Sequence, residues 1–254
     1  MPALFVGHGN PMNAIEDNIF TKGFASIAKD LPVPKQIICI SAHWETNGTQ
    51  VCNVEMPQTI HDFYGFPKEL FEVSYPAPGD PALARAIATT TEKFGTSLTD
   101  SWGIDHGAWS VLVHMYPKAQ IPVVQLSLNR SWSARQHFEL AKELNKLRDD
   151  GAMIIGSGNL VHNLSKVDWK LGNNGYDWAE EANFEIKKHI YTKSYNELIS
   201  YEKLGSAVRT AIPTPEHFLP LLYVLAQNTD SAEPEFFNDE LALGSLSMTS
   251  VIIR

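Results

Sequence analysis

Three histidines of this chain come directly after short apolar runs, and small or polar residues surround each of them. His8, His43 and His162 lie in the segments Gly7–Asn10, Ser41–Glu45 and Gly156–Asn163. A neutral imidazole is a good ligand for Fe²⁺ or Zn²⁺, whereas Mg²⁺ and Ca²⁺ prefer oxygen ligands. A single histidine in such a place could equally be a structural residue at the end of a strand. Because the arrangement recurs, we expect the three rings to converge on one mononuclear metal site.

A fourth histidine, His217, ends the sequence Thr-Pro-Glu-His over 214–217. We predict that this sequence opens a helix, with Thr214 as the cap, Pro215 in the first position and His217 in the third. The dipole of a helix disfavours positive charge at its amino end, so His217 would stay neutral and able to bind a metal. The spacing of the four histidines is not a local signature such as His-Glu-x-x-His, so the pattern by itself does not fix the ligand set.

Two other histidines lie among residues typical of loops. His106 stands in the sequence Asp-His-Gly, where we expect exposed, flexible surroundings. It could act as an acid or base, or the motif could cap a helix. His61 belongs to the stretch Thr59–Pro67 and could bind a substrate or pin the loop in place. The remaining histidines fall within predicted helices, where a structural or solvent-exposed role is expected: His114, His137 and His189.

The segment Met56–Gly79 reads as one long loop, rich in aromatic residues and proline. Loops of this length inside compact domains are usually functional or disordered. The aromatic content argues against disorder, so we interpret the loop as the wall of a pocket. Our hypothesis is that Thr59–Pro67 covers a bound substrate, with contacts from His61 or Asp62 and from Tyr64. The alternative is that its rings only pack against the domain.

The elements that would position these residues alternate between short apolar runs and amphipathic segments. The runs typical of buried strands are Ala3–Val6, Gln36–Ile40, Ile121–Leu128 and Ala152–Ser157, with Thr49–Val54 as a possible adjoining strand and Leu243–Ile253 as an edge strand. The predicted helices are Asn18–Asp30 (Ile19, Phe24 and Ile27 inward), Pro81–Phe94, Ala108–Met115, Ser133–Arg148, Trp178–Thr192 and Glu197–Leu204. This alternation predicts a single α/β domain over residues 1–254, with a mostly parallel central sheet and helices on both faces. Ligands of such sheets bind beyond the carboxyl ends of the strands, where the histidines would lie.

The composition limits the partners of the protein. The formal net charge of −9 argues against a nucleic acid or an anionic membrane, because either would need a basic face. No apolar run is long enough to span a bilayer, and we recognise no signal peptide at the start of the sequence. The two cysteines, Cys39 and Cys52, are expected to stay reduced in a cytoplasmic protein, with a disulfide between neighbouring strands as the alternative. The sequence leaves the oligomeric state open.

Seven motifs, in order along the chain, resemble those of the class III extradiol ring-cleavage dioxygenases. They are Gly7–Met12, Ser41–Glu45, Thr59–Pro67, Tyr75–Gly79, Asp105–Trp109, Ser157–Leu164 and Thr214–Leu222. This superfamily is the one that includes the B subunit of protocatechuate 4,5-dioxygenase. Within it, the chain is most similar to the 4,5-DOPA dioxygenase extradiol-like branch, and the resemblance covers essentially the whole sequence.

The resemblance implies a role for each histidine in these motifs. The implied metal ligands are His8, His43 and His217; the implied base, able to approach the metal as a fourth ligand, is His162; the implied acid is His106. His217 stands where distant relatives use a glutamate, so one negative charge would be missing from the ligand set. Glu216 is the fallback carboxylate, but neighbouring residues of a helix point about 100° apart, so Glu216 and His217 are not expected to serve together.

The activity implied by the resemblance is the opening of a catechol ring beside its two hydroxyl groups. The partners would be a small catechol, such as DOPA, and O₂, with one divalent metal ion as cofactor. Fe²⁺ is expected for this chemistry, and Zn²⁺ is plausible as the bound ion, although zinc has no accessible redox change. The alternatives are a zinc-dependent hydrolase and a catalytically silent protein that binds a metal or an aromatic compound on the same scaffold.

Overall fold

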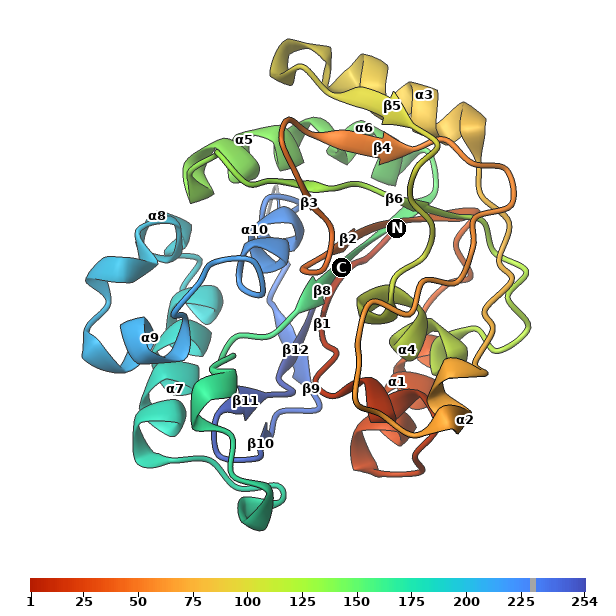
Figure 1. The fold of residues 1–254 in the computed structure, drawn as a ribbon. Helices are drawn as coiled ribbons and strands as arrows, with labels where there is room; N and C mark the ends of the chain where they lie inside the picture. Colours follow the sequence, from red (N-terminus) through yellow and green to blue (C-terminus); the bar gives the residue numbers. More distant parts are fainter. Residues whose placement is uncertain (229–231) are drawn as a thin grey trace.

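A six-stranded sheet crosses the centre of the molecule in this computed structural model, which describes residues 1–228 and 232–254 (Figure 1). The strand order is β6-β2-β8-β1-β12-β9. The first four strands run parallel, and β12 pairs antiparallel with both β1 and β9. The bounds are β1 Ala3–Gly7, β2 Gln36–Ser41, β6 Val123–Gln125, β8 Ala152–Gly158, β9 Glu235–Phe237 and β12 Ser250–Ile253. The predicted α/β fold with a mostly parallel central sheet is confirmed.

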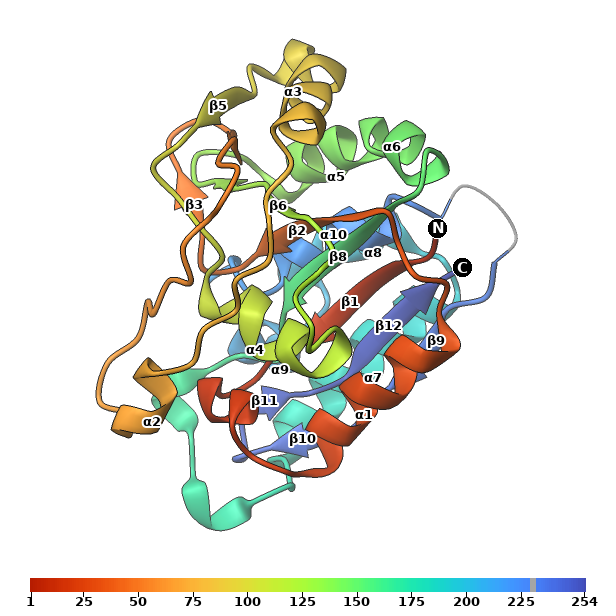
Figure 2. The same cartoon turned by 90° about the vertical axis from the view of Figure 1, so that its right-hand side faces the viewer.

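Both faces of the sheet are covered because its central strands are apolar on both sides. In β2, Ile38 and Ile40 belong to one core cluster and Ile37 and Cys39 to the other, as expected when successive side chains point to opposite faces. The helices α1 (Ile19–Asp30) and α4 (His106–Met115) pack on the side of Ile37 and lie in front of the sheet in Figure 2, and Leu70 adds to the same cluster. The other cluster takes side chains from α3 (Pro81–Thr90), α5 (Ala134–Glu143), α6 (Asn145–Asp149), α7 (Asp177–Tyr191), α8 (Tyr195–Ile199), α9 (Ser206–Ala211) and α10 (Leu219–Leu225).

Short strand pairs and single helical turns lie outside the central sheet. Three two-stranded pairs are β3 (Glu45–Thr46) with β7 (Leu128–Asn129), β4 (Gln50–Cys52) with β5 (Ser97–Thr99), and β10 (Leu241–Ala242) with β11 (Leu246–Ser247). A single helical turn, α2 (Lys68–Phe71), interrupts the long loop. Short 3₁₀ helices cover Pro11–Ala14, Glu92–Phe94, Leu164–Lys166, Trp169–Leu171 and Tyr201–Lys203. Within the described ranges, no helix is both long and apolar enough to cross a membrane.

The structure corrects several predicted strands. Leu243–Ile253 is not one edge strand: Leu243 and Gly244 have positive φ angles of 52° and 79°, which interrupt it, and β12 lies between β1 and β9. The run Ile121–Leu128 splits into β6 and β7 as the chain leaves the sheet. Thr49–Val54 contributes β4, which pairs with β5. Val51 of β4 also forms a single bridge with Leu126, which lies between β6 and β7.

Three predicted helices also differ from the structure, in an inward residue, in continuity and in the first residue. Ile19 is the first residue of α1 and is 53% exposed, so the predicted inward position is wrong; Phe20 and Phe24 face the core instead. Ser133–Arg148 is divided at Leu144 into α5 and α6. The helix predicted from Thr214 begins only at Leu219, because the Thr214 hydroxyl donates to Glu216 at 2.9 Å and does not cap the backbone.

Candidate metal centre

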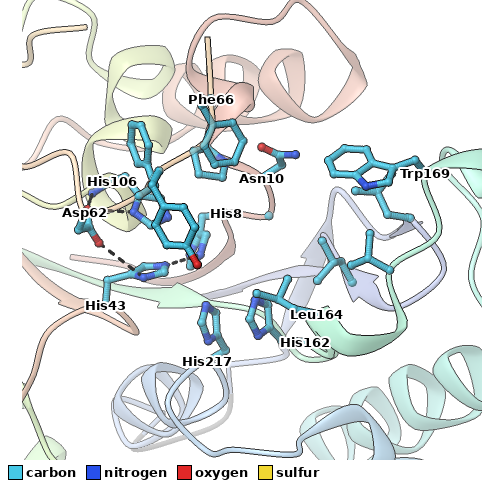
Figure 3. Close-up of a pocket in the computed structure, with 17 residues that line it drawn as sticks. His8, Asn10, His43, Asp62, Phe66, His106, His162, Leu164, Trp169 and His217 are labelled. Atoms are coloured by element: carbon cyan, nitrogen blue, oxygen red, sulfur yellow. Dashed lines mark hydrogen bonds and ion pairs between the residues drawn. The ribbon is translucent and has the colours of Figure 1, made fainter. Parts of the chain in front are cut away.

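Three imidazoles from separate parts of the chain converge at the carboxyl edge of the sheet. His8 follows β1, His43 follows β2, and His217 lies in the turn before α10 (Figure 3). One nitrogen from each ring lies within 4.8 Å of the others, and Nε2 of His8 is 3.1 Å from Nε2 of His43. The sequence therefore identified residues that the fold brings together. Of these three, only His8 and His43 follow strands of the sheet, as the sequence argument required.

Close backbone contacts bring His217 to this edge. The backbone N–H of Asn159, just after β8, donates to the carbonyl oxygen of His217 at 2.9 Å. A Cβ atom on Gly158 would lie 2.0 Å from that same oxygen. Only glycine at 158 therefore lets the turn of His217 approach the end of β8 so closely.

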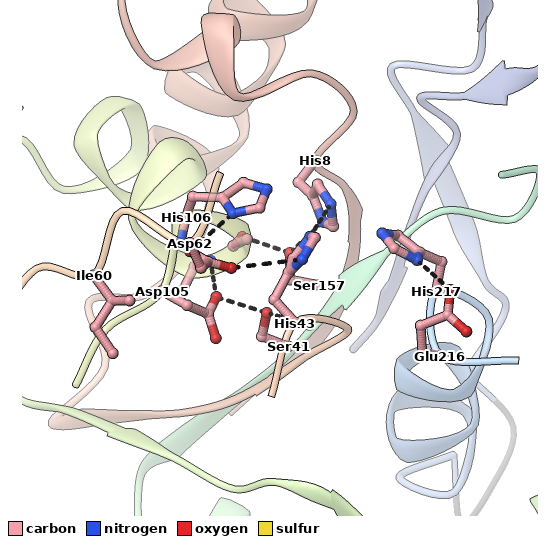
Figure 4. Close-up of polar contacts among 12 residues, drawn as sticks. His8, Ser41, His43, Ile60, Asp62, Asp105, His106, Ser157, Glu216 and His217 are labelled. Atoms are coloured by element: carbon pink, nitrogen blue, oxygen red, sulfur yellow. Dashed lines mark hydrogen bonds and ion pairs between the residues drawn. The ribbon is translucent and has the colours of Figure 1, made fainter. Parts of the chain in front are cut away.

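The hydrogen bond behind His8 fixes which ring nitrogen is available. Nδ1 of His8 lies 2.9 Å from Oγ of Ser157, and that hydroxyl donates to the carbonyl oxygen of Gly107 at 2.5 Å (Figure 4). Because Ser157 has only one hydrogen to donate, it must accept from Nδ1–H of His8. The lone pair of His8 is then on Nε2, the atom that faces His43.

The Nδ1 atom of His217 is also hydrogen-bonded, in this case to a carboxylate. Its Nδ1 lies 3.1 Å from Oε1 of Glu216, which can only accept when ionised. Its Nε2 is buried and has no hydrogen-bond partner among the described residues. A buried nitrogen without a partner is costly, and a metal ion would satisfy it.

The rings are held neutral by their surroundings. Burial, together with the neighbouring histidines, places the pKa of His8 and of His217 well below the ordinary value. Burial, reinforced by His106 and opposed by Asp62, lowers the pKa of His43 to about 3. Nε2 of His8 and Nε2 of His43 lie 3.1 Å apart, and when Nδ1 of His43 carries its proton toward Asp62, both Nε2 lone pairs face the same point. Two ligands about 2.1 Å from one metal ion, at angles of about 90–110°, lie about 3.0–3.4 Å apart, so the donor set fits a single Fe²⁺ or Zn²⁺.

His106 is not in exposed, flexible surroundings, as the sequence suggested. It is the first residue of α4 and is 4% exposed. Asp105 caps this helix by accepting from the N–H of Ala108 at 3.2 Å. The two roles considered for the Asp-His-Gly motif are therefore compatible. The motif caps a helix, and the His106 ring lines the cavity beside His43, with ring centroids 3.9 Å apart.

A buried polar network holds this helix start against the sheet. The carboxylate of Asp105 accepts from Oγ of Ser41 at 2.7 Å and from Nε2 of Gln125 at 2.8 Å. Oγ of Ser41 in turn accepts from the backbone N–H of His43 at 3.2 Å. Burial and the nearby Asp62 raise the pKa of Asp105, while these hydrogen bonds oppose the rise.

His162 lies flat against one of the three converging rings. Its ring stacks on His217 with centroids 3.4 Å apart and an interplanar angle of 9°. Its ligand atom groups with those of Glu216 and His217, whereas the cluster that contains both His8 and His43 is a separate one. Burial lowers the pKa of His162 to about 4, so the ring is neutral at pH 7 and keeps a lone pair on one nitrogen. This placement is compatible with both predicted roles of His162, as a base and as a fourth ligand.

The histidines form the floor of a cavity of about 400 Å³. Its apolar wall comes partly from the long loop, as predicted, and partly from a segment that the sequence reasoning missed: Phe63, Tyr64 and Phe66 on one side, Leu164, Val167 and Trp169 on the other. Tyr64 is 92% exposed at this wall. His61 is not among the lining residues, and its Nε2 donates to the carbonyl oxygen of Val73 at 3.0 Å, which favours the loop-pinning alternative.

Two carboxylates beside the histidines were underestimated from the sequence. Asp62, one of the two residues considered as a substrate contact, lines the cavity, and its oxygens also face His106 and His43. Glu216 was not expected to act together with His217, because that argument assumed a helix; the two share a turn, and their side chains touch. The only signal in the sequence was the presence of each acid beside a histidine of a motif.

Comparison with known proteins agrees with this geometry. Residues 2–252 match the family described as the catalytic LigB subunit of aromatic ring-opening dioxygenase. The chain is 46% identical to the 4,5-DOPA dioxygenase extradiol of Escherichia coli K12, over all of this chain and 94% of that one, and 34% identical to the protein of the same name from Beta vulgaris, over 97% and 96%. It also matches the crystal structure of an uncharacterised E. coli K12 protein over the full length of both chains, with a TM-score of 0.88 and 40% identity. The chain therefore belongs to the family of the catalytic LigB subunit of aromatic ring-opening dioxygenases.

Proposed function

We propose that the protein is an extradiol ring-cleaving dioxygenase, which opens a catechol with O₂ in one catalytic domain spanning residues 1–254. The observation that carries the proposal is the convergence of the His8, His43 and His217 nitrogens at the floor of an aromatic cavity. Family membership and relatives named 4,5-DOPA dioxygenase extradiol support the same chemistry. The proposed ligands of one divalent metal ion are Nε2 of these three histidines.

A bound Fe²⁺ would supply the redox chemistry that lets electrons pass from the catechol to O₂, which Zn²⁺ cannot do. The residues of this chain would bind the substrate and move its protons. Phe63 and Phe66 on the loop and Leu164 and Trp169 on the opposite segment would enclose the ring and exclude water.

Two further histidines are proposed to handle protons. His162, neutral and stacked on His217, would accept the proton of a catechol hydroxyl at a ring nitrogen. His106 has its Nδ1 3.0 Å from Oδ1 of Asp62, which leaves Nε2 as the atom at which it would hold a proton and release it to the opening ring.

The donor set also suits Zn²⁺, so a zinc-dependent hydrolase is the second candidate. In that case the three neutral imidazoles would hold a zinc ion with a water in the open position. Hydrolysis would need neither O₂ nor a redox-active metal.

Metal replacement separates the two candidates. The protein would be purified without oxygen, analysed for metal, and loaded with Fe²⁺ or Zn²⁺ before an oxygen-electrode screen of catechols that includes DOPA. We expect the Fe²⁺ form to consume O₂ and to yield a yellow ring-opened product, and the Zn²⁺ form and the His43→Ala variant to yield none. Equal product from both metals, or no product from the iron-loaded protein across the panel, would exclude the dioxygenase.

A further inference from the structure

We propose that Asp62 is a positioning residue that serves His43 and His106 together, and that it couples the loop segment Thr59–Pro67 to metal binding. The proposal rests on the proposed role of His43 as a metal ligand. It assigns Asp62 no contact with the substrate. Its basis is the placement of one carboxylate between two imidazoles that come from different elements of the fold (Figure 4).

The backbone just before Asp62 is fastened to the start of α4. The N–H of Ile60 donates to the carbonyl oxygen of Ile104, and Nε1 of Trp109 donates to the carbonyl oxygen of Ile60, each at 2.8 Å. Oγ1 of Thr59 accepts from the N–H of Tyr75 at 2.9 Å, which ties the two ends of the loop together. Asp62 is therefore presented from a fixed backbone two residues away.

The two oxygens of Asp62 face different partners. Oδ1 accepts from the backbone N–H of His106 at 3.0 Å and lies 3.0 Å from Nδ1 of the same residue. Oδ2 lies 3.6 Å from Nδ1 of His43, the ring nitrogen on the side away from His8. Burial raises the pKa of the Asp62 carboxyl, but the contacts with His106 and His43 outweigh it and lower the pKa below its ordinary value.

This geometry links the loop to a ligand. A metal on Nε2 of His43 withdraws electron density from the ring and makes Nδ1–H a stronger donor toward Oδ2 of Asp62. The distance of 3.6 Å is too long for a good hydrogen bond, so metal binding has room to strengthen this contact. Coupling between two events is reciprocal, so a metal that holds Asp62 more firmly must itself bind more tightly when Asp62 is present.

A purely structural alternative is that Asp62 only completes the cap of α4 through the N–H of His106. Asp62→Asn separates the two roles. The asparagine keeps an amide oxygen for the backbone N–H, but it loses the negative charge and offers a donor where His43 requires an acceptor. A capping residue would thus tolerate the substitution, whereas a shared positioning residue would not.

The experiment uses the full chain and Zn²⁺ as the probe, so that turnover is not needed. Zinc affinity is measured by competition with a chromophoric chelator, and amide hydrogen exchange over residues 59–67 is followed with and without zinc. Wild type is compared with Asp62→Asn and with Glu69→Gln, which makes the same change of charge at an exposed site on the same loop. A Co²⁺ absorption spectrum reports the ligand geometry in each variant.

For wild type and Glu69→Gln, we expect zinc to slow exchange over residues 59–67 by about 5-fold or more. For Asp62→Asn, we expect zinc to bind about 10- to 100-fold more weakly and the protection of the loop to disappear. Zinc affinity within about 2-fold of wild type, or unchanged protection of the loop, would overturn the proposal, whether or not the melting temperature falls. Loss of all ring cleavage in wild type, with this coupling intact, would refute the proposed function and leave the role of Asp62 standing.

Discussion

Replacing His61 and Tyr64 one at a time should separate a residue that pins the long loop from one that contacts substrate. His61→Ala removes the hydrogen bond to the carbonyl oxygen of Val73 and ring contacts with Phe63, Phe71 and Trp109, whose centroids lie 5.8, 6.1 and 5.5 Å away. One hydrogen bond contributes about 1 kcal/mol and the aromatic packing about another, so we expect a loss of about 2 kcal/mol. For a chain of this size, that is a fall of about 4–8 °C in melting temperature.

Tyr64→Ala should weaken substrate binding and leave the stability of the fold almost unchanged. The side chain is 92% exposed, so its removal should change the free energy of unfolding by less than about 0.5 kcal/mol. Tyr64 lines the cavity, and loss of its contact with a catechol, worth about 0.5–1.5 kcal/mol, should raise KM about 2- to 10-fold with kcat nearly unchanged.

Thermal unfolding followed by circular dichroism and steady-state oxygen uptake by the iron-loaded enzyme measure the two effects on the same preparations. Metal content should equal that of wild type in both variants. The reasoning fails if His61→Ala keeps its melting temperature while losing kcat/KM, because His61 would then be a substrate contact. It fails equally if Tyr64→Ala destabilises the fold and leaves KM unchanged.

Three other predictions concern a second carboxylate of the site, a buried histidine of the core and the choice of substrate. Glu216→Gln replaces the charged acceptor of His217 Nδ1 with a neutral one, and should weaken zinc binding about 10-fold in a chelator competition; unchanged affinity would contradict this. Burial lowers the pKa of His137 to about 4, so the unfolded chain takes up a proton near pH 6.5 that the native state refuses. The buried histidines of the site add to the loss of stability between pH 7 and pH 4.5, so the loss measured in urea should be about 2–3 kcal/mol smaller in His137→Gln than in wild type; an equal loss would contradict this. The residues that line the cavity include no Lys or Arg in the part of the chain described, so 3,4-dihydroxybenzoate should show a KM about 10-fold above that of 4-methylcatechol; an equal or lower KM would show that a carboxylate is recognised.

The sequence predicts the buried strands well because their signal is local. β1, β2 and β8 are apolar on both faces, and such runs are readable without knowledge of their neighbours. The position of β12 is not local information. Ser250–Ile253 is an inner strand because Glu235–Phe237 pairs along its outer side, and these three residues of β9 are too few for a periodic pattern.

The residues of the site also divide into those that local sequence signals predict and those that only tertiary contacts bring together. His8 and His43 can be predicted to converge because parallel strands end at one edge. His217 reaches that edge through the approach of its carbonyl oxygen to Asn159 and Gly158, a tertiary contact that no spacing reveals. Asp62 is hidden for the same reason, since His106 lies 44 residues further along the chain.

The position of negative charge around the three imidazoles follows from these tertiary contacts. In a set of two histidines and one carboxylate, the anion would touch the metal directly. Here Glu216 stands behind His217, with Oε1 3.1 Å from Nδ1, and Asp62 stands behind His43, with Oδ2 3.6 Å from Nδ1. Each carboxylate can increase the basicity of its ring without occupying a coordination position. If these rings are the ligands, the all-imidazole set keeps its anionic partners one ring further out, and the positions that a catechol and O₂ require stay open.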